Sequence, residues 1–144
     1  MSVEDLKKVI AVVSDFKFLN RNFNNLYHQL RVNGKYDGEI LVITSLFTPT
    51  FLIKSIKKKH NIKVLRFKKV KFDKITEFEL NNLETFDDPN RNKTKKFQWH
   101  KLHLFDEYIK NWNHVLYLDI NMNIHHDINK ILDISPKNHF MARA

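Results

Sequence analysis

Short apolar runs, separated by longer segments with helical periodicity, are the feature that most constrains the fold of this chain. Residues 9–13 (VIAVV), 40–43 (ILVI) and 114–118 (HVLYL) are apolar at consecutive positions, with little alternation. A strand of this kind buries both of its faces, as the strands of parallel sheets do. Residues 16–30 and 51–56 instead repeat apolar side chains every three or four positions, which indicates amphipathic helices. The pattern predicts helices on both faces of a mainly parallel central sheet.

Local signals extend this prediction over the rest of the chain. Thr48 and Pro49 supply a capping hydroxyl and a proline at the first helical position, and Gly34 stands where the preceding helix should end. We predict one α/β domain over residues 1–144, a Rossmann-like three-layer domain with right-handed crossovers. The other predicted elements are a short strand at 62–65 with a candidate extension over 68–72, a weak helix at 74–86, an interior-facing helix at 94–111, a helical turn at 125–134 and the start of a fifth strand at 139–142.

Composition removes several classes of function. The chain has no cysteine, so it has no disulfide, thiolate nucleophile or cysteine-bound metal, and this composition suits a cytoplasmic protein. It has two glycines and no glycine-rich phosphate loop, which excludes Walker-type and dinucleotide-binding fingerprints. We expect no transmembrane segment, because no stretch approaches the roughly 18 apolar residues that one requires. Any phosphate on a ligand would have to be bound by a metal ion or by Lys and Arg.

The net charge of +9 suits nucleic acid, anionic lipid or a ligand that carries phosphate. An A+T-rich coding sequence would also enrich the chain in lysine without any functional demand. Nucleic acid is the less favoured partner, because a run of charge is more often a solvated helix face. The residues that could form a basic face for nucleic acid are Lys54, Lys57, Lys58, Lys59, Lys68, Lys69 and Lys71.

An aspartate at the end of an apolar strand is the strongest local signal of a site. Open parallel sheets bind ligands beyond the carboxyl ends of their strands, which places residues 14–15, 44–45 and 119–121 on one rim. In extended backbone, Asp119 and Asn121 would point the same way and could together hold one Mg²⁺ or Mn²⁺ ion. The simpler alternative is an Asp119 that only closes an Asx-turn.

Residues 97–128, FQWHKLHLFDEYIKNWNHVLYLDINMNIHHDI, resemble the retaining GT-A glycosyltransferases of the glycogenin and bacterial galactosyltransferase kind, glycosyltransferase family 8. That family has a lysine–leucine pair that opens a helix and, after a short gap, a strand that ends in Asp-x-Asp. Lys101 and Leu102 match the pair, VLYLD matches the strand, and Asp127 and Ile128 match a following Asp-Ile. Near the N-terminus, VIAVVSD and YDGEILVITS resemble the first two strands of the family.

The resemblance implies a GT-A nucleotide-sugar-binding domain that takes a UDP-sugar and Mn²⁺ or Mg²⁺ and transfers a hexose to an acceptor. It also implies that Lys101 contacts the sugar nucleotide and that Asp119 and Asn121 occupy the positions of the metal-binding Asp-x-Asp pair. The other donor-binding positions that it implies are Val13, Ser14, Phe18, Arg91 and Ile120.

The chain departs from the family pattern in two ways. Asn121 replaces an aspartate and brings no charge; at about 4 Å and an effective dielectric of about 20, one charge pair is worth roughly 4 kcal/mol. The family's further metal-ligating histidine and its glycine–lysine signature, which lie far downstream, have no counterpart here. We therefore expect a domain truncated relative to the family, with doubtful activity by itself. Two alternatives stay open: a non-catalytic remnant of the fold, and a basic α/β module that binds nucleic acid.

Four histidines are further candidates for residues at or near the rim. His125 or His126 could replace the missing metal ligand, although adjacent side chains diverge by about 100° in a helical turn. His100 and His103 flank Lys101 at helical spacing and could border the rim, but the core or the surface is the more frequent place for such residues.

A sheet that ends at its fifth strand would expose an edge, so we expect a homodimer or a second chain to cover it.

Overall fold

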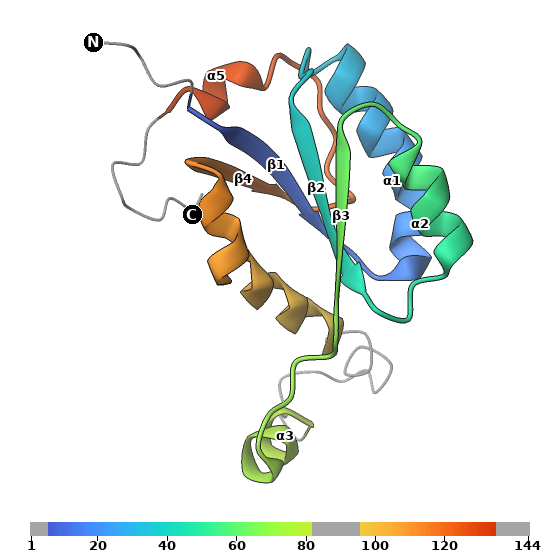
Figure 1. Ribbon diagram of the computed structural model, residues 1–144, viewed down its shortest axis with the longest axis vertical. Coiled ribbons are helices and arrows are strands. Elements are labelled where there is room, and N and C mark those ends of the chain that lie inside the picture. The colour runs from blue at the N-terminus through green and yellow to red at the C-terminus, as the bar shows by residue number, and fades with distance from the viewer. Residues whose placement is uncertain (1–5, 82–95, 135–144) are drawn as a thin grey trace.

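The centre of the protein is a sheet of four parallel strands in the order β3-β2-β1-β4 (Figure 1). The computed structural model describes residues 6–81 and 96–134. The predicted α/β class and the mainly parallel sheet are confirmed. The strands are β1 (Lys8–Val13), β2 (Glu39–Ser45), β3 (Ile62–Phe67) and β4 (His114–Leu118), with register pairs such as Ala11 with Leu41 and Tyr117.

Helices cover both faces of this sheet, as the apolar runs predicted. On one face lie α1 (Phe16–Val32), α2 (Thr50–Lys57) and α5 (Asn129–Leu132) (Figure 1). On the other face lie two 3₁₀ helices, η1 (Lys96–Phe105) and η2 (Glu107–Asn111). Successive side chains of a strand point to opposite faces, so each central strand supplies residues to two separate cores. Ile10 and Val12 face α1, whereas Val9, Ala11 and Val13 face the 3₁₀ helices.

Helix α1 forms because its apolar residues recur on one side and its N-terminus is capped. The side chain of Asp15 accepts a hydrogen bond from the Phe18 backbone N–H at 2.9 Å, which satisfies one of the unpaired donors of the first turn. Leu19, Phe23, Leu26 and Leu30 are buried against the sheet. The helix ends as predicted just before Gly34, where a Cβ atom would lie 2.8 Å from the Leu30 carbonyl oxygen. Only a residue without a side chain fits there without a shift.

The predicted start of α2 is correct in place but wrong in its cap. Pro49 is the residue that caps the helix, and its carbonyl accepts from Leu52 N. The Thr48 hydroxyl is buried and lies 2.7 Å from the Thr44 hydroxyl. Thr48 therefore closes the turn after β2 and is not available to the helix.

The single helix predicted over residues 94–111 is also wrong. The described part of this segment forms η1 and η2, which are separated at Asp106. Backbone bonds run from Asp106 to His103, from Ile109 to Asp106 and from Trp112 to Ile109, each spanning three residues. The Asp106 carboxylate lies 2.7 Å from Nδ1 of His103. That carboxylate forms no capping hydrogen bond at the start of η2.

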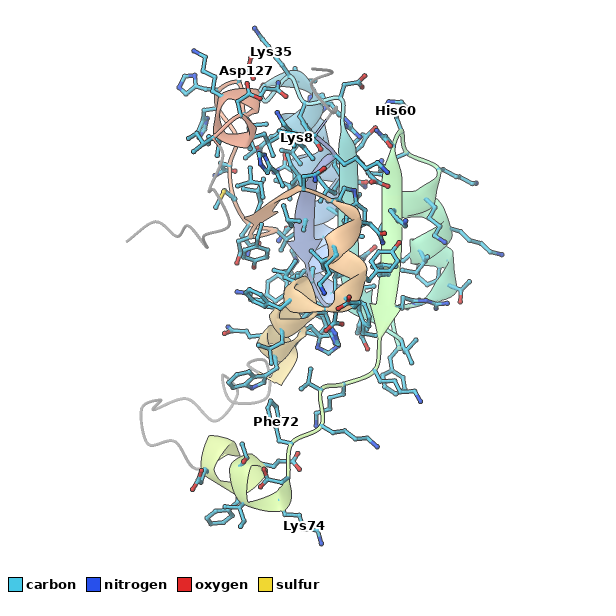
Figure 2. All side chains as sticks on the ribbon, turned by 60° about the vertical axis from the view of Figure 1, so that its left-hand side comes forward. Lys8, Lys35, His60, Phe72, Lys74 and Asp127 are labelled. Carbon is cyan, nitrogen blue, oxygen red and sulfur yellow. The ribbon has the colours of Figure 1, made fainter. Side chains whose placement is uncertain are left out.

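Helix α3 (Lys74–Asn81) lies away from the rest of the described protein, beyond the carboxyl ends of the strands (Figure 1). Strand β3 ends at Phe67, so the extension over residues 68–72 is not formed. Figure 2 shows Phe72 and Lys74 at this end and Lys8, Lys35, His60 and Asp127 at the opposite end. The predicted helix at 74–86 and turn at 125–134 are confirmed within α3 and α5, whereas residues 139–142 lie outside the described residues.

Candidate functional site

The order of the strands defines the place where a sheet of this class binds ligands. From β1 the chain passes through α1 to β2 and then to β3 on one side, whereas β4 pairs with β1 on its other side. The carboxyl ends of β1 and β4 therefore flank the switch point, where the strand order reverses and at which open parallel sheets bind ligands. Helix α1 and the segment from β4 to α5 both leave this point on the same face of the sheet. Ser14 and Asp15 follow β1 at this point, and Asp119 follows β4.

Asp119 is exposed at the switch point, as the rim prediction required. Its Oδ1 atom accepts a hydrogen bond from Asn121 N at 3.0 Å, and its carbonyl accepts from Met122 N at 3.0 Å. A turn therefore begins at Asp119, and the expected extended backbone through Asn121 is wrong. The Asx-turn, the simpler alternative, is the observed conformation. Oδ2 of Asp119 has no hydrogen-bond partner among residues 6–81 and 96–134.

Asn121 is turned toward α1. Its side-chain oxygen accepts a hydrogen bond from the Asn22 amide at 2.5 Å. Farther along, Ile124 N donates to the Gln29 side-chain oxygen at 2.6 Å, and the Asn33 amide donates to the Ile124 carbonyl at 2.8 Å. Three amides on one side of α1 thus hold the segment that follows Asp119. No local pattern predicts this role, because polar residues on the outer side of an amphipathic helix give no sign of a partner.

Four of the other predicted donor-binding residues lie at the rim, but their side chains are buried or half-buried. Val13 and Ile120 are buried and belong to the apolar clusters on opposite faces of the sheet. Ser14 is buried; its N–H donates to the Ile43 carbonyl at 3.0 Å, and its hydroxyl donates to the Asp15 carbonyl at 3.1 Å. Phe18 is half-buried and packs against the α1 core. These residues shape the rim chiefly through their backbone.

Lys101 approaches the same strand end from the opposite face. Its Nζ atom lies 5.2 Å from the centre of the Tyr117 ring, two residues before Asp119. Within the described part of the chain no ion pair joins Lys101 to Asp119. Arg91 lies outside the described residues. Lys101 thus lies at the strand that precedes Asp119, and its ammonium group lies over the ring of Tyr117.

His125 and His126 are exposed and lie near the far end of the sheet. They adjoin Asp127, which Figure 2 shows beside Lys35, at the end opposite to Phe72. The contacts agree, since Asn129 Nδ2 bonds both Asp127 Oδ1 at 2.9 Å and the Lys35 carbonyl at 3.0 Å. Across residues 6–81 and 96–134 no three His, Cys, Asp or Glu side chains gather in an arrangement that could hold a metal ion.

Two histidines of η1 face the sheet, and of these His100 is buried and His103 is half-buried. His100 is 3% exposed and stacks on Phe97 at 4.2 Å, while His103 stacks on Phe67 at 4.0 Å. Neither ring nitrogen of His100 forms a hydrogen bond of good geometry with a described residue. Burial lowers the pKa of His100, the neighbouring His103 lowers it further, and backbone groups of Phe67 and Phe97 oppose the shift. The core placement, left open by the sequence, is the observed one.

A concave surface lies at the amino end of the sheet, and several of the side chains that line it contact one another. Trp112 Nε1 donates to Glu39 Oε2 at 2.7 Å, and Lys63 Nζ lies 5.0 Å and 5.4 Å from the ring centres of Tyr108 and Trp112. The hydrogen bond that the Lys63 ammonium donates to Tyr108 is the main cause that raises the pKa of Lys63. Because its charges and rings already pair with one another, this surface is a structural element.

No protein-family model matches this chain, and comparisons with curated proteins and with solved structures gave no match either. The resemblance to glycosyltransferase family 8 therefore remains a prediction. None of the described helices is long and apolar enough to cross a membrane.

Proposed function

We propose that this protein binds a UDP-sugar at the switch point between β1 and β4, as the donor domain of a GT-A-like glycosyltransferase that transfers a hexose to an acceptor. The observation that carries the proposal is an exposed carboxylate, Asp119, at the carboxyl end of a parallel strand beside the switch point. The resemblance in residues 97–128 supports the same site. Cytoplasmic location and a second chain over the sheet edge remain part of the proposal.

The donor atoms at the rim fit a weakly held hard cation. Mg²⁺ and Mn²⁺ at phosphate sites are commonly held by one or two carboxylates, with phosphates and water as the other ligands. Asp119 offers Oδ2 for this purpose, while the oxygen of Asn121 would have to leave Asn22. When bound, such an ion would neutralise charge on the diphosphate. Lys101 would contribute a second positive charge from the other face of the sheet.

A non-catalytic remnant of the fold is the second candidate, and a specific observation favours it. Both members of the expected metal pair already have local partners, since Asp119 accepts from Asn121 N and Asn121 accepts from Asn22. A rim whose polar atoms pair with the protein itself no longer needs a ligand. The two candidates make opposite predictions for nucleotide binding.

Calorimetric titration with UDP, with and without Mn²⁺, tests the proposal. We expect binding that strengthens with Mn²⁺ and that weakens about tenfold or more in Asp119→Ala, since the variant removes a charged ligand. Asp37→Ala is the matched control, because Asp37 is an exposed carboxylate before β2 at the other end of the sheet. Absence of Mn²⁺-dependent heat in the unaltered protein would refute the proposal. Salt-sensitive binding to an oligonucleotide that ignores Asp119→Ala would indicate the nucleic-acid module instead.

Asn121→Asp separates the donor domain from the remnant. Aspartate keeps an oxygen that can accept from the Asn22 amide and adds the charge that the family pattern has at this position. The donor-domain proposal predicts that affinity for Mn²⁺–UDP rises about tenfold or more. An unchanged affinity would assign the rim to a structural role only.

A further inference from the structure

Positive charge is concentrated in one continuous stretch of the chain. Residues 46–74 contain ten Lys and Arg residues and a single carboxylate, Asp73. This stretch comprises the turn after β2, helix α2, the edge strand β3 and the link to α3. The charge therefore lies on one side of the protein, from α2 to the carboxyl end of the sheet.

Most of these cations have no counter-ion in the part of the chain that the structure describes. Lys69 lies 3.7 Å from Glu77, and Lys59 and Lys63 lie over aromatic rings. The other six lysines form no ion pair with residues 6–81 or 96–134: Lys54, Lys57, Lys58, Lys68, Lys71 and Lys74. Their charge is available to an external anionic partner.

Large apolar side chains project from the same region. Phe47 is 85% exposed and Phe51 is 73% exposed, and they lie four residues apart in the turn before α2 and in its first turn. Leu46 and Phe16 are also exposed. Helices α1 and α2 lie side by side, with their first turns at the same end of the sheet (Figure 1). Exposed phenylalanines that gather in this way mark an interaction surface.

The outer side of α2 combines both features. Leu52, Ile53 and Ile56 are buried against the sheet, so the opposite side of the helix faces solvent. Phe51, Lys54 and Lys58 are spaced three and four residues apart and lie on that outer side. Exposed phenylalanines beside lysines supply the two attractions that hold a surface on a membrane, which are burial of apolar area and charge opposite to that of anionic lipid.

We propose that this α2 surface, formed by Leu46, Phe47, Phe51, Lys54 and Lys58, docks on an anionic membrane. The phenylalanines would enter the headgroup layer, while the lysines would contact anionic headgroups. The charge and the projecting rings favour a membrane over nucleic acid, because proteins that stack single-stranded bases usually expose a flat sheet or a groove. Here helices cover both faces of the sheet. The inference does not depend on the proposed nucleotide site.

Vesicle co-sedimentation of the full chain tests the proposal. We expect binding to phosphatidylcholine vesicles that contain about 30% phosphatidylserine, weak binding to phosphatidylcholine alone, and a decrease at high salt. Phe47→Ser with Phe51→Ser should weaken binding about tenfold or more, because both rings leave the interface. Lys54→Gln with Lys58→Gln should weaken it about fivefold for each charge. Phe47→Trp should show a blue-shifted fluorescence emission on anionic vesicles.

Matched controls are available at the other end of the sheet. Ile131 and Ile134 are each 52% exposed near α5, so Ile131→Ser with Ile134→Ser also replaces two exposed apolar side chains by serine. Lys110→Gln with Lys130→Gln removes the same charge as the α2 variant. Both controls should bind vesicles like the unaltered protein. Failure to bind anionic vesicles, equal binding by the Phe47 and Phe51 variant, or a stronger loss of oligonucleotide binding than of vesicle binding in that variant would overturn the proposal.

Discussion

On the α1 side of the sheet, a regular amphipathic helix places four fully buried residues against strand side chains that are also fully buried. On the opposite side, the 3₁₀ helices η1 and η2 contribute mainly half-buried side chains, together with the buried imidazole of His100. Both sides use the same strands, whose alternate residues are equally apolar. The difference therefore arises from the covering helices.

Helical geometry explains much of this difference. An α-helix presents an apolar stripe wide enough to cover a sheet continuously. A 3₁₀ helix aligns residues three apart and forms weaker hydrogen bonds, so it covers less surface over the same number of residues. The second face compensates with stacked rings, such as Phe97 on His100 and Phe67 on His103. Most of the stability should thus come from the α1 face, and most of the pH sensitivity from the η1 face.

Phe23→Ala should produce the largest effect. Phe23 is 2% exposed at the centre of the α1 core, and its removal should lower the free energy of unfolding by about 3–5 kcal/mol through lost burial and a cavity. Phe97→Ala on the η1 face should cost about half as much, since Phe97 is only half-buried. Urea denaturation followed by circular dichroism measures both. Equal losses would show that the two faces contribute equally.

Gly34→Ala should destabilise the α1 face by about 1–3 kcal/mol. The new Cβ atom would lie 2.8 Å from the Leu30 carbonyl oxygen and 3.2 Å from Ile124 Cγ2. The end of α1, the segment around Ile124, or both must then shift. The same denaturation experiment applies, with Lys35→Ala as a neighbouring exposed control. A loss confined to the control would contradict the steric account.

His100→Leu should stabilise the η1 face by about 1 kcal/mol at neutral pH, because it removes two buried nitrogens without good hydrogen-bond partners. Thermal unfolding at fixed pH measures this change. His60→Leu is a suitable control, since His60 is exposed at the other end of the sheet. A clear decrease in stability would show that His100 makes a contact that outweighs its desolvation.

The unaltered protein should lose stability as the pH falls below about 6.5, the ordinary histidine value. The pKa of His100 is lower in the folded state than in the unfolded state, so the unfolded chain takes up a proton first. The stability is full above pH 6.5 and declines as the pH approaches the lowered pKa. His103, Asp106 and Lys101 are the charged or titratable groups nearest along η1. A matching decline in His100→Leu would assign the pH dependence to other groups.

Asn22→Ala should have the smallest effect, about 1 kcal/mol, through loss of the hydrogen bond to Asn121. Its more informative consequence is at the rim, where the Asn121 oxygen would become free. Under the proposed function, Mn²⁺-dependent UDP binding should stay equal or increase in this variant. Gln29→Ala, which removes the acceptor for Ile124 N farther along α1, is the control. A decrease in UDP affinity specific to Asn22→Ala would show that the turn must be held for the site to form.

The sequence predicted the architecture better than the local geometry. Consecutive apolar runs located β1, β2 and β4, the short strand predicted at 62–65 located β3, and the spacing from Phe16 to Leu30 located α1. The prediction failed at Thr48, at the helix through residues 94–111 and at the backbone after Asp119. At Thr48 and at Asp119 the side chain bonds a partner other than the expected one, and local spacing does not show which partner is nearer in the folded chain.

The apolar pattern by itself determined that this chain forms a parallel sheet covered on two faces, because strands that are apolar at every position must lose water from both sides. It also determined that Asp119 ends a strand. Only the tertiary structure decided what surrounds Asp119. The turn is held by the hydrogen bond from Asn22 to Asn121, two residues that are 99 positions apart in the chain. A hydrogen bond across that separation depends on how α1 and β4 pack on the same sheet, and no local motif encodes that distance.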